Sequence, residues 1–349
     1  MTTSPIRNAL LLLAGISILA PERAAAQDAQ RIRDSLRAQI EQRKSQISRS
    51  ADQFFDAQLS TADRLKAVAG LSEFQTLDQT ARAARIAFDP AASVELRVRA
   101  LRLGSPIFQS DTSTQKRLLN LLGDSGTALD LRREALIVLQ LEQFAGPIPG
   151  ADSLLRVLSR DPNPQVKGGA ISQLAVKGDT SAQAALIEGL RDPARAVLPE
   201  DVALALLSLH PTARARAAAA EVMNSRSDER VKESAARVAF DSRRDQQRLI
   251  RTVSDARATT GVRVIAIQAL AAQDPAVLAR SADTLLSNES ESDSVRVAII
   301  EALRLRATDV PAAVGTNLEA VLRRLQSETR SAAVRDAAAR YLAEREGTE

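Results

Sequence analysis

The chain has 349 residues, of which 45% are apolar but only 2% are aromatic. The 47 basic and 43 acidic side chains nearly cancel to a formal charge of +4, which gives no case for a nucleic-acid-binding stripe. The sequence contains no cysteine, which excludes disulfides, thiolate metal sites and a lipid anchor on cysteine. This length would ordinarily suggest two or three globular domains, but the composition favours small apolar residues on closely packed helices.

Residues 1–26 have the features of a secretory signal peptide. Arg7 supplies a positive charge, the apolar segment ALLLLAGISILA follows, and Ala24 and Ala26 form an A-x-A cleavage site before Gln27. The apolar run is shorter than the roughly 20 residues that a bilayer span needs, so we expect cleavage rather than an uncleaved anchor. We therefore expect a periplasmic or secreted protein with no stable membrane insertion after cleavage.

Residues 27–60 are expected to form one long helix, because 28–59 contain neither glycine nor proline and carry apolar residues at helical spacing. Ile32, Leu36 and Ile40 begin this apolar face, and Ile47 and Phe54 continue it. The C-terminal half is interpreted as the first helix of an array, with a solvated extension before it. A coiled-coil dimerisation arm is the alternative, although too few apolar heptad positions are sustained to favour it. The oligomeric state stays open.

The segment DPNPQVKGGAISQLAV, residues 161–176, contains a module that recurs along most of the chain. After a prolyl turn, Val166, Ala170 and Leu174 stand at i, i+4 and i+8, and the base Lys167 follows the valine. Aligning similar segments on the position of Val166 gives anchors 30–39 residues apart, at positions 63, 96, 131, 166, 201, 231, 262, 295 and 334. A period in this range indicates a repeat architecture.

A second amphipathic segment lies between consecutive anchors, and the separators are short and rich in Asp, Pro and Ser. Asp and Ser side chains cap helices that begin after them. Each unit is therefore predicted to be a first helix, a turn and a second helix that bears the apolar face. The fit is weakest at position 201, because Val202 stands where the base should be. The prediction is an all-α solenoid over residues 61–346.

The repeated unit resembles a HEAT repeat of the short, bilin-lyase-like (PBS-lyase) type, whose pattern has a turn Asp, a Val-Arg pair and a following Ala and Leu. The resemblance covers residues 61–346 and implies a superhelical array of about nine helix–turn–helix repeats. It says little about function, because such repeats serve many unrelated roles.

Eight bases follow the anchors and form what we call the Lys/Arg ladder: Arg64, Arg97, Arg132, Lys167, Lys232, Arg263, Arg296 and Arg335. One interpretation is a stripe that binds anions. The other is structural, since in HEAT-like proteins the equivalent base pairs with turn Asp residues between repeats. The balanced charge of the chain offers little electrostatic steering, which favours the structural interpretation.

Three other patterns could carry chemistry. Ser113 and Lys116 match the S-x-x-K nucleophile motif, but the companion Ser-Asp-Asn and Lys-Thr-Gly segments do not occur and no strand pattern surrounds it. We interpret it as the first turn of a helix. His210 is the only histidine and precedes a proline, so we expect it to interact with the C-terminal end of a helix rather than to act as a base.

Glu289, Glu291 and Asp293 alternate in a loop that could hold Ca²⁺. An EF-hand loop needs Gly at its sixth position and Glu at its twelfth, and this segment has Asp293 and Ile299 there when counted from Asn288. A calcium site is therefore disfavoured. The sequence predicts no catalytic residue, no cofactor and no metal.

The favoured function is an exported, non-enzymatic scaffold or adaptor that binds an unidentified protein through the concave surface of its second helices. The alternative is a binder of an anionic envelope polymer or of lipid head groups through the Lys/Arg ladder. An enzyme, either a lyase or an S-x-x-K hydrolase, is favoured least. Export and balanced charge disfavour a DNA-glycosylase-like role, so no nucleic-acid partner is expected.

Overall fold

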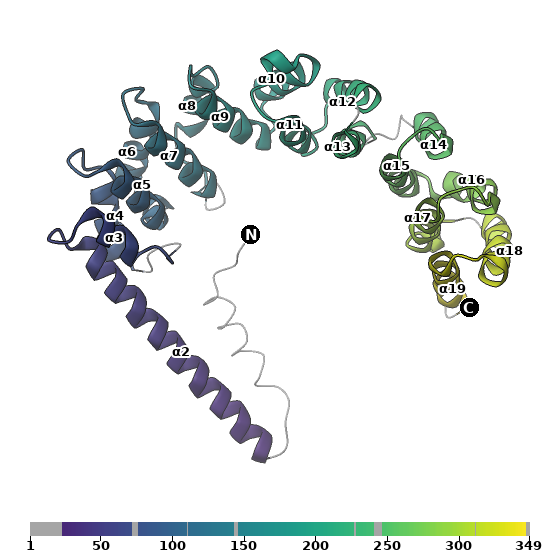
Figure 1. The fold of residues 1–349 in the computed structure, drawn as a ribbon, viewed down its shortest axis with the longest axis horizontal. Helices are drawn as coiled ribbons and strands as arrows, with labels where there is room; N and C mark the ends of the chain where they lie inside the picture. Colours follow the sequence, from purple (N-terminus) through teal and green to yellow (C-terminus); the bar gives the residue numbers. More distant parts are fainter. Residues whose placement is uncertain are drawn as a thin grey trace. The chain divides into compact units, whose positions relative to one another are not determined.

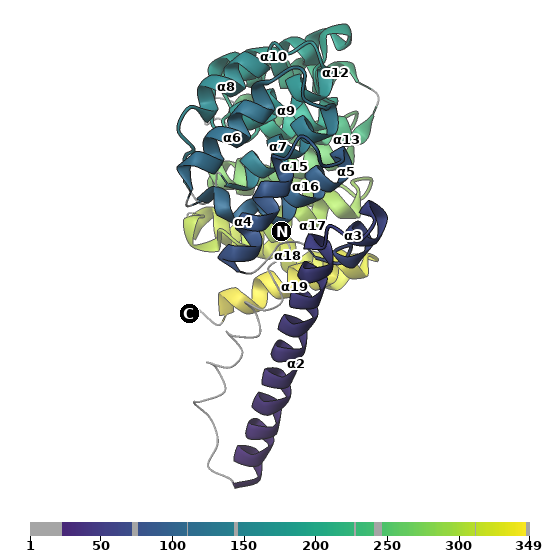
Figure 2. The same cartoon turned by 90° about the vertical axis from the view of Figure 1, so that its left-hand side faces the viewer.

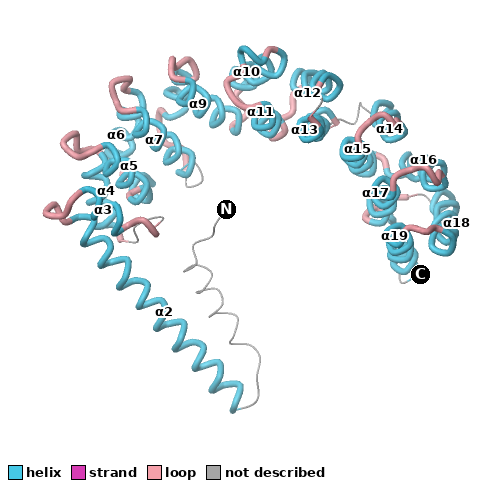
Figure 3. Tube along the Cα trace, in the orientation of Figure 1, coloured by secondary structure: helices cyan, strands magenta, loops and turns pink. Residues whose placement is uncertain are grey.

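The computed structural model describes residues 23–71, 76–109, 111–142, 146–226, 228–240, 246–310 and 312–346. Within these ranges every regular element is a helix, and short loops and 3-10 turns connect the α-helices (Figure 1 and Figure 3). The prediction of an all-α chain is confirmed for this part of the protein.

The chain divides into two compact units, Met1–Leu158 and Ser159–Glu349, which we describe separately. The helices of the first unit are α2 (Arg23–Phe55), α3 (Thr61–Ala67), α4 (Leu77–Ala87), α5 (Val94–Leu103), η2 (Ser105–Gln109), α6 (Thr112–Gly123), α7 (Leu129–Glu142) and α8 (Ala151–Leu158).

The second unit continues the same alternation of helices. Its elements are α9 (Pro164–Val176), α10 (Thr180–Arg191), η3 (Pro193–Arg195), α11 (Glu200–Leu207), α12 (Ala213–Ser225), α13 (Glu229–Ala239), α14 (Gln246–Ser254), α15 (Thr260–Gln273), α16 (Pro275–Ser287), α17 (Asp293–Arg304), η5 (Ala307–Asp309), α18 (Ala312–Glu328) and α19 (Ala332–Glu346).

The helices alternate between two roles, which we call helix A (the even-numbered α-helices) and helix B (the odd-numbered ones from α3 onward). Each predicted anchor position falls on the second or third residue of a helix B: 63 in α3, 96 in α5, 131 in α7, 166 in α9, 201 in α11, 231 in α13, 262 in α15, 295 in α17 and 334 in α19. Within each unit, consecutive helices A and B are in contact, so the repeat read from the sequence corresponds there to a helical hairpin in space.

Side chains at the N-cap explain where most helices B begin. The Ser93 hydroxyl accepts a hydrogen bond from the Leu96 amide at 3.3 Å, which satisfies one of the free N–H groups at the helix start. The same arrangement recurs at Ser60, Asn163, Asp228, Thr259, Ser292 and Ser331. Pro199, which precedes α11, is an exception and offers no side-chain cap.

The hairpins of each unit stack in two layers. In the first unit, α5 packs between α3 and α7, all of them helices B. In the second unit, α15 packs between α13 and α17, and α16 contacts α14 and α18 in the layer of helices A. Figure 1 shows this arrangement for α10 to α13, where α10 and α12 lie in one layer and α11 and α13 in the other.

The core consists mainly of alanine and leucine. The alanine four residues after the anchor is fully buried at Ala100, Ala135, Ala170, Ala235, Ala266 and Ala338. Small side chains at this position let the backbones of neighbouring helices approach closely. Each buried Val or Leu contributes about 1.5–3 kcal/mol, but only when the next hairpin covers it, so the stability of such a stack depends on neighbour contacts.

The long helix α2 joins the first unit only through its C-terminal part. Ile47, Ala51 and Phe54 are buried, whereas Ile32 is 50% exposed. Both Figure 1 and Figure 2 show the earlier turns of α2 extending away from α3. The assignment of the C-terminal half as the first helix of the array, with a solvated extension before it, stays a prediction. The dimerisation arm, and the domain boundary expected at residue 60, stay predictions.

The expected signal peptide lies mostly outside the described residues. Residues 1–22 are outside the described residues, whereas Ala24 and Ala26 fall in the first turn of α2. Cleavage after Ala26 therefore stays a prediction. Among the helices in the described ranges, none is long and apolar enough to cross a membrane.

Candidate functional site

The Lys/Arg ladder is largely occupied by hydrogen bonds within the hairpins. In four hairpins the arginine Nε donates to the backbone carbonyl ten residues earlier, near the end of helix A: Arg64 to Phe54 at 2.8 Å, Arg97 to Ala87 at 3.1 Å, Arg132 to Leu122 at 3.0 Å and Arg263 to Val253 at 2.9 Å. A cation also stabilises the negative end of a helix dipole. The structural interpretation is supported, but the usual acceptor is a carbonyl rather than a turn Asp.

The hairpin of α10 and α11 has no base at its ladder position. Val202 of α11 replaces the base and is 38% exposed. The Leu190 carbonyl, near the end of α10, instead accepts a hydrogen bond from Nη2 of Arg226 at 3.2 Å. Arg226 follows α12 and thus comes from the next hairpin. An arginine from outside the hairpin supplies the cation that its own ladder position lacks.

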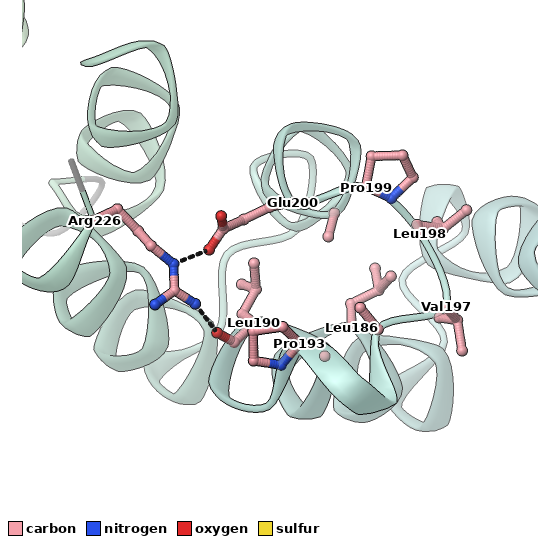
Figure 4. A pocket seen from close by; sticks show the side chains of 11 residues that line it. Leu186, Leu190, Pro193, Val197, Leu198, Pro199, Glu200 and Arg226 are labelled. Carbon is pink, nitrogen blue, oxygen red and sulfur yellow. Dashed lines mark hydrogen bonds and ion pairs between the residues drawn. The ribbon is translucent and has the colours of Figure 1, made fainter. Parts of the chain in front are cut away.

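A cavity of about 200 Å³ lies at this irregular hairpin (Figure 4). Its lining is mostly apolar and comes from α10, from η3 and the loop after it, and from the first turn of α11. The residues are Leu186, Gly189, Leu190, Pro193, Ala196, Val197, Leu198, Pro199, Glu200, Ala203 and Arg226. A mostly apolar cavity with a few polar groups at its edge is the usual form of a small-molecule site.

Two glycines let the loop of residues 193–199 approach the helices. A Cβ atom on Gly189 of α10 would lie 2.9 Å from the Cα atom of Ala196, and one on Gly168 of α9 would lie 3.0 Å from the Val197 carbonyl oxygen. A Cβ atom on Gly189 would overlap the loop backbone, and one on Gly168 would be in tighter contact with the carbonyl oxygen than side chains usually are. The close approach of the loop, which forms one wall of the cavity, therefore requires glycine at position 189.

A charged pair forms the polar edge of the cavity. Nε of Arg226 donates to Oε1 of Glu200 at 2.8 Å, and the two side chains are 31% and 29% exposed. Figure 4 shows the guanidinium group directed toward Glu200 and toward the Leu190 carbonyl. Nη1 of Arg226 makes no hydrogen bond within the described part of the chain.

The S-x-x-K segment belongs to the start of a helix. The Asp111 carboxylate caps α6 by accepting from the amides of Ser113 at 3.0 Å and Thr114 at 3.2 Å. Hydrogen bonds from the Thr114 hydroxyl and these amides lower the pKa of Asp111. Ser113 therefore occupies the first turn of a helix A, and Lys116 lies at the start of the second turn.

His210 lies where a helix ends, as its position before proline indicated. Its Nε2 atom is 2.9 Å from the carbonyl oxygen of Val176, the last residue of α9. The His210 carbonyl accepts a hydrogen bond from Nε2 of Gln183 at 3.1 Å. These contacts connect the end of one hairpin to the start of the next and give the imidazole a structural role.

The acidic loop at residues 289–293 faces arginines. Glu291 pairs with Arg263, and Asp293 accepts from Nη2 of Arg296 at 2.7 Å. Carboxylates engaged in this way are poor candidates for calcium ligands, which must direct several oxygens to one point. In the described ranges, no group of three or more His, Cys, Asp or Glu side chains is placed to hold a metal ion.

Comparisons with known proteins give a likeness at the level of structure. No known family profile matches the sequence, and a search of curated proteins finds no relative. Among solved structures, the chain is similar to the complex of CpcE and CpcF of phycocyanin lyase from Nostoc sp. PCC7120. The identity is 17% and the TM-score 0.35, with 74% of this chain and 97% of that chain covered. The resemblance to bilin-lyase-like HEAT repeats is supported only coarsely, as an arrangement of helical repeats.

The comparisons do not support the function expected from the sequence. The prediction of a non-enzymatic scaffold is withdrawn: the similar structure is that of a lyase, and no family profile or curated relative points to a scaffold. The likeness is too distant to assign a reaction to this chain. The alternative, a polymer-binding or lipid-binding ladder, is unsupported as well, because four of its guanidinium groups already bond to helix carbonyls. A protein partner stays an untested expectation.

Proposed function

We propose that this protein binds a small, partly apolar molecule in the cavity beside α10 and α11. The observation that carries the proposal is an apolar space of about 200 Å³ with the Arg226 and Glu200 pair at its edge. An apolar cavity of about 150 Å³ is large enough for a benzene ring. The cavity therefore suits one aromatic ring or a short branched alkyl group.

The polar edge suggests what else the ligand carries. Arg226 places a positive charge at the edge of the apolar cavity, and a charge-assisted hydrogen bond to a carboxylate is about twice as strong as a neutral one. A ligand with a carboxylate next to its apolar group would use both features. Glu200 already holds Nε of Arg226, which fixes the guanidinium group before any ligand arrives.

We also propose a repeat family and a cellular compartment for the chain. We propose that the hairpins are short HEAT repeats, on the grounds of the Val-Arg, Ala and Leu pattern. We also propose that the chain is exported, on the grounds of the apolar segment and A-x-A site in residues 1–26. The ligand would then be met in the periplasm or outside the cell.

Titration calorimetry with benzoate, benzyl alcohol and acetate tests ligand binding. We expect saturable binding of benzoate, weaker binding of benzyl alcohol and none of acetate. Ala203→Phe fills the cavity and should abolish binding, whereas Ala205→Phe, at an exposed position of the same helix, should leave it unchanged. Far-UV circular dichroism checks that both variants fold.

A second variant keeps the test valid if Ala203→Phe fails to fold. Arg226→Met should reduce benzoate affinity about tenfold, the value of a charge-assisted hydrogen bond, and remove the preference over benzyl alcohol. Lack of saturable binding by either aromatic probe would refute the proposal. Equal loss of affinity in the Ala203→Phe and Ala205→Phe proteins would refute the assigned location.

A further inference from the structure

A second, strongly polar cleft of about 750 Å³ lies elsewhere in the second unit. It is formed by the end of α16, the start of α17, the end of α18 and the turn into α19. Its lining residues are Leu286, Ser287, Glu289, Asp293, Arg296, Arg324, Leu325, Glu328, Thr329, Arg330 and Ser331. Three arginines from separate places in the chain thus reach the same space.

Arg296 is the ladder arginine that departs from the carbonyl bond seen in four other hairpins. It is only 8% exposed, and its Nη2 atom donates to Oδ1 of Asp293 at 2.7 Å. Its Nε atom is buried and has no hydrogen-bond partner among the described residues. This Nε atom is enclosed by the protein and does not face solvent. The guanidinium group nevertheless places a buried positive charge in the wall of the cleft.

Two further donors line the cleft. Nη2 of Arg324 donates to the Ser287 hydroxyl at 2.5 Å, and Arg330 lies in the turn before α19. Ser331 caps the N-terminus of α19, because its hydroxyl accepts from the Val334 amide at 3.4 Å. The positive end of this 15-residue helix adds to the field of the arginines.

Three carboxylates oppose an anion here. Asp293 is already compensated, because it accepts hydrogen bonds from Arg296 and from the Ser331 hydroxyl. Glu289 and Glu328 are exposed to solvent, which screens their charge. These three carboxylates therefore oppose an anion less than their number suggests.

We propose that this cleft binds a phosphate group, either as the free ion or as a phosphate monoester. Phosphate offers several acceptor oxygens, and arginine matches its geometry with paired N–H donors. The ligand is a discrete oxyanion held by Arg296 and Arg324, with Arg330 at the rim, and not a polymer laid along the ladder. The inference is independent of the apolar cavity and of the ligand proposed there.

Titration of the full protein with inorganic phosphate and with phenyl phosphate, in a low-salt buffer, tests the site. Arg324→Gln should weaken binding about tenfold, as expected for one charge-assisted bond. Arg323→Gln is the matched control, because Arg323 is the preceding residue of α18, is 60% exposed and lies 3.8 Å from Glu319 instead of in the cleft. It should change the affinity by no more than about twofold, the effect of one screened surface charge.

A third variant tests the sign of the field. Glu328→Gln removes a negative charge from the rim and should tighten phosphate binding about twofold to threefold at low salt. The site is refuted if phosphate shows no saturable binding, or if Arg323→Gln weakens binding as much as Arg324→Gln does. A Glu328→Gln protein with unchanged affinity would also count against it. Tighter binding of phenyl phosphate than of the free ion would identify the monoester as the ligand.

Discussion

Arg263 and Glu291 form a buried ion pair with two hydrogen bonds. Nη1 of Arg263 donates to Oε1 of Glu291 at 2.8 Å, Nη2 donates to Oε2, and both side chains are 7% exposed. Because Nε of the same arginine bonds to the Val253 carbonyl at 2.9 Å, one guanidinium group connects its own hairpin to the next. The contact between α15 and the turn before α17 is therefore made by an ion pair as well as by apolar side chains.

Removing the carboxylate should strongly destabilise the second unit. Glu291→Ala leaves the Arg263 charge buried without its partner, and breaking a buried pair in this way costs about 3–5 kcal/mol. Urea unfolding followed by circular dichroism measures the loss. Glu289→Ala is the control, since this exposed glutamate is two residues away and its loss should change stability by less than about 0.5 kcal/mol. Similar midpoints for the two variants would contradict the role given to the pair.

The same pair predicts a loss of stability in acid. Burial alone would raise the pKa of Glu291, but hydrogen bonds from Arg263 and from the Ser292 amide outweigh it and lower the pKa below its usual value. A lowered native pKa stabilises the fold above the unfolded value of about 4.3. That contribution disappears as the pH falls through the native pKa. The urea midpoint of the wild-type protein should thus drop more between pH 6 and pH 3 than that of Glu291→Gln; parallel curves would contradict this.

The arginine–carbonyl bond can be tested at two adjacent residues. Arg132 is buried and donates from Nε to the Leu122 carbonyl at 3.0 Å, whereas Arg133 is 51% exposed and lies 3.5 Å from Asp130. Arg132→Met should cost about 1–3 kcal/mol, the penalty for leaving a buried polar group unpaired. Arg133→Met should cost less than about 1 kcal/mol, as for other surface ion pairs. The prediction fails if thermal melts rank the two variants in the opposite order.

Helix capping gives a prediction at another adjacent pair. The Thr259 hydroxyl accepts from the Val262 amide at 3.4 Å, while Thr260 is exposed in the first turn of α15. Thr259→Ala should lower stability by about 1 kcal/mol. Thr260→Ala should be neutral or slightly stabilising, because alanine has the higher helix propensity. Hydrogen exchange of the α15 amides measures both effects, and equal exchange rates in the two proteins would exclude a capping role.

The hairpins were predictable from the sequence because their signals are local. Val166, Ala170 and Leu174 follow a helical period, and a capping residue such as Asn163 stands just before them. Both signals lie within a few residues of the helix that they specify, so the anchors fall inside helices B even where the repeat is weak, as at Asp201.

The candidate sites were not predictable, because they depend on contacts between hairpins. In the sequence, Val202 differs from the repeat only in standing where a base is expected, yet it lies in the hairpin that has the apolar cavity. Its substitute, Arg226, lies 36 residues from the carbonyl of Leu190 that it binds. Likewise, Arg296 matches the repeat in sequence, and only its surroundings distinguish it from Arg263. Departures from a repeat pattern were the one available signal for the first site.

The bond between a ladder arginine and a carbonyl ten residues earlier begins and ends inside a single hairpin. A duplicated stretch of about 35 residues would carry both the donor and the acceptor. Each new copy could therefore form the hydrogen bond across its own turn without help from a neighbouring hairpin. Lengthening or shortening the turn by one residue would move the carbonyl away from the arginine and leave the guanidinium group without its hydrogen-bond acceptor. Arrays of this kind can therefore gain or lose whole units more readily than single residues at the bends.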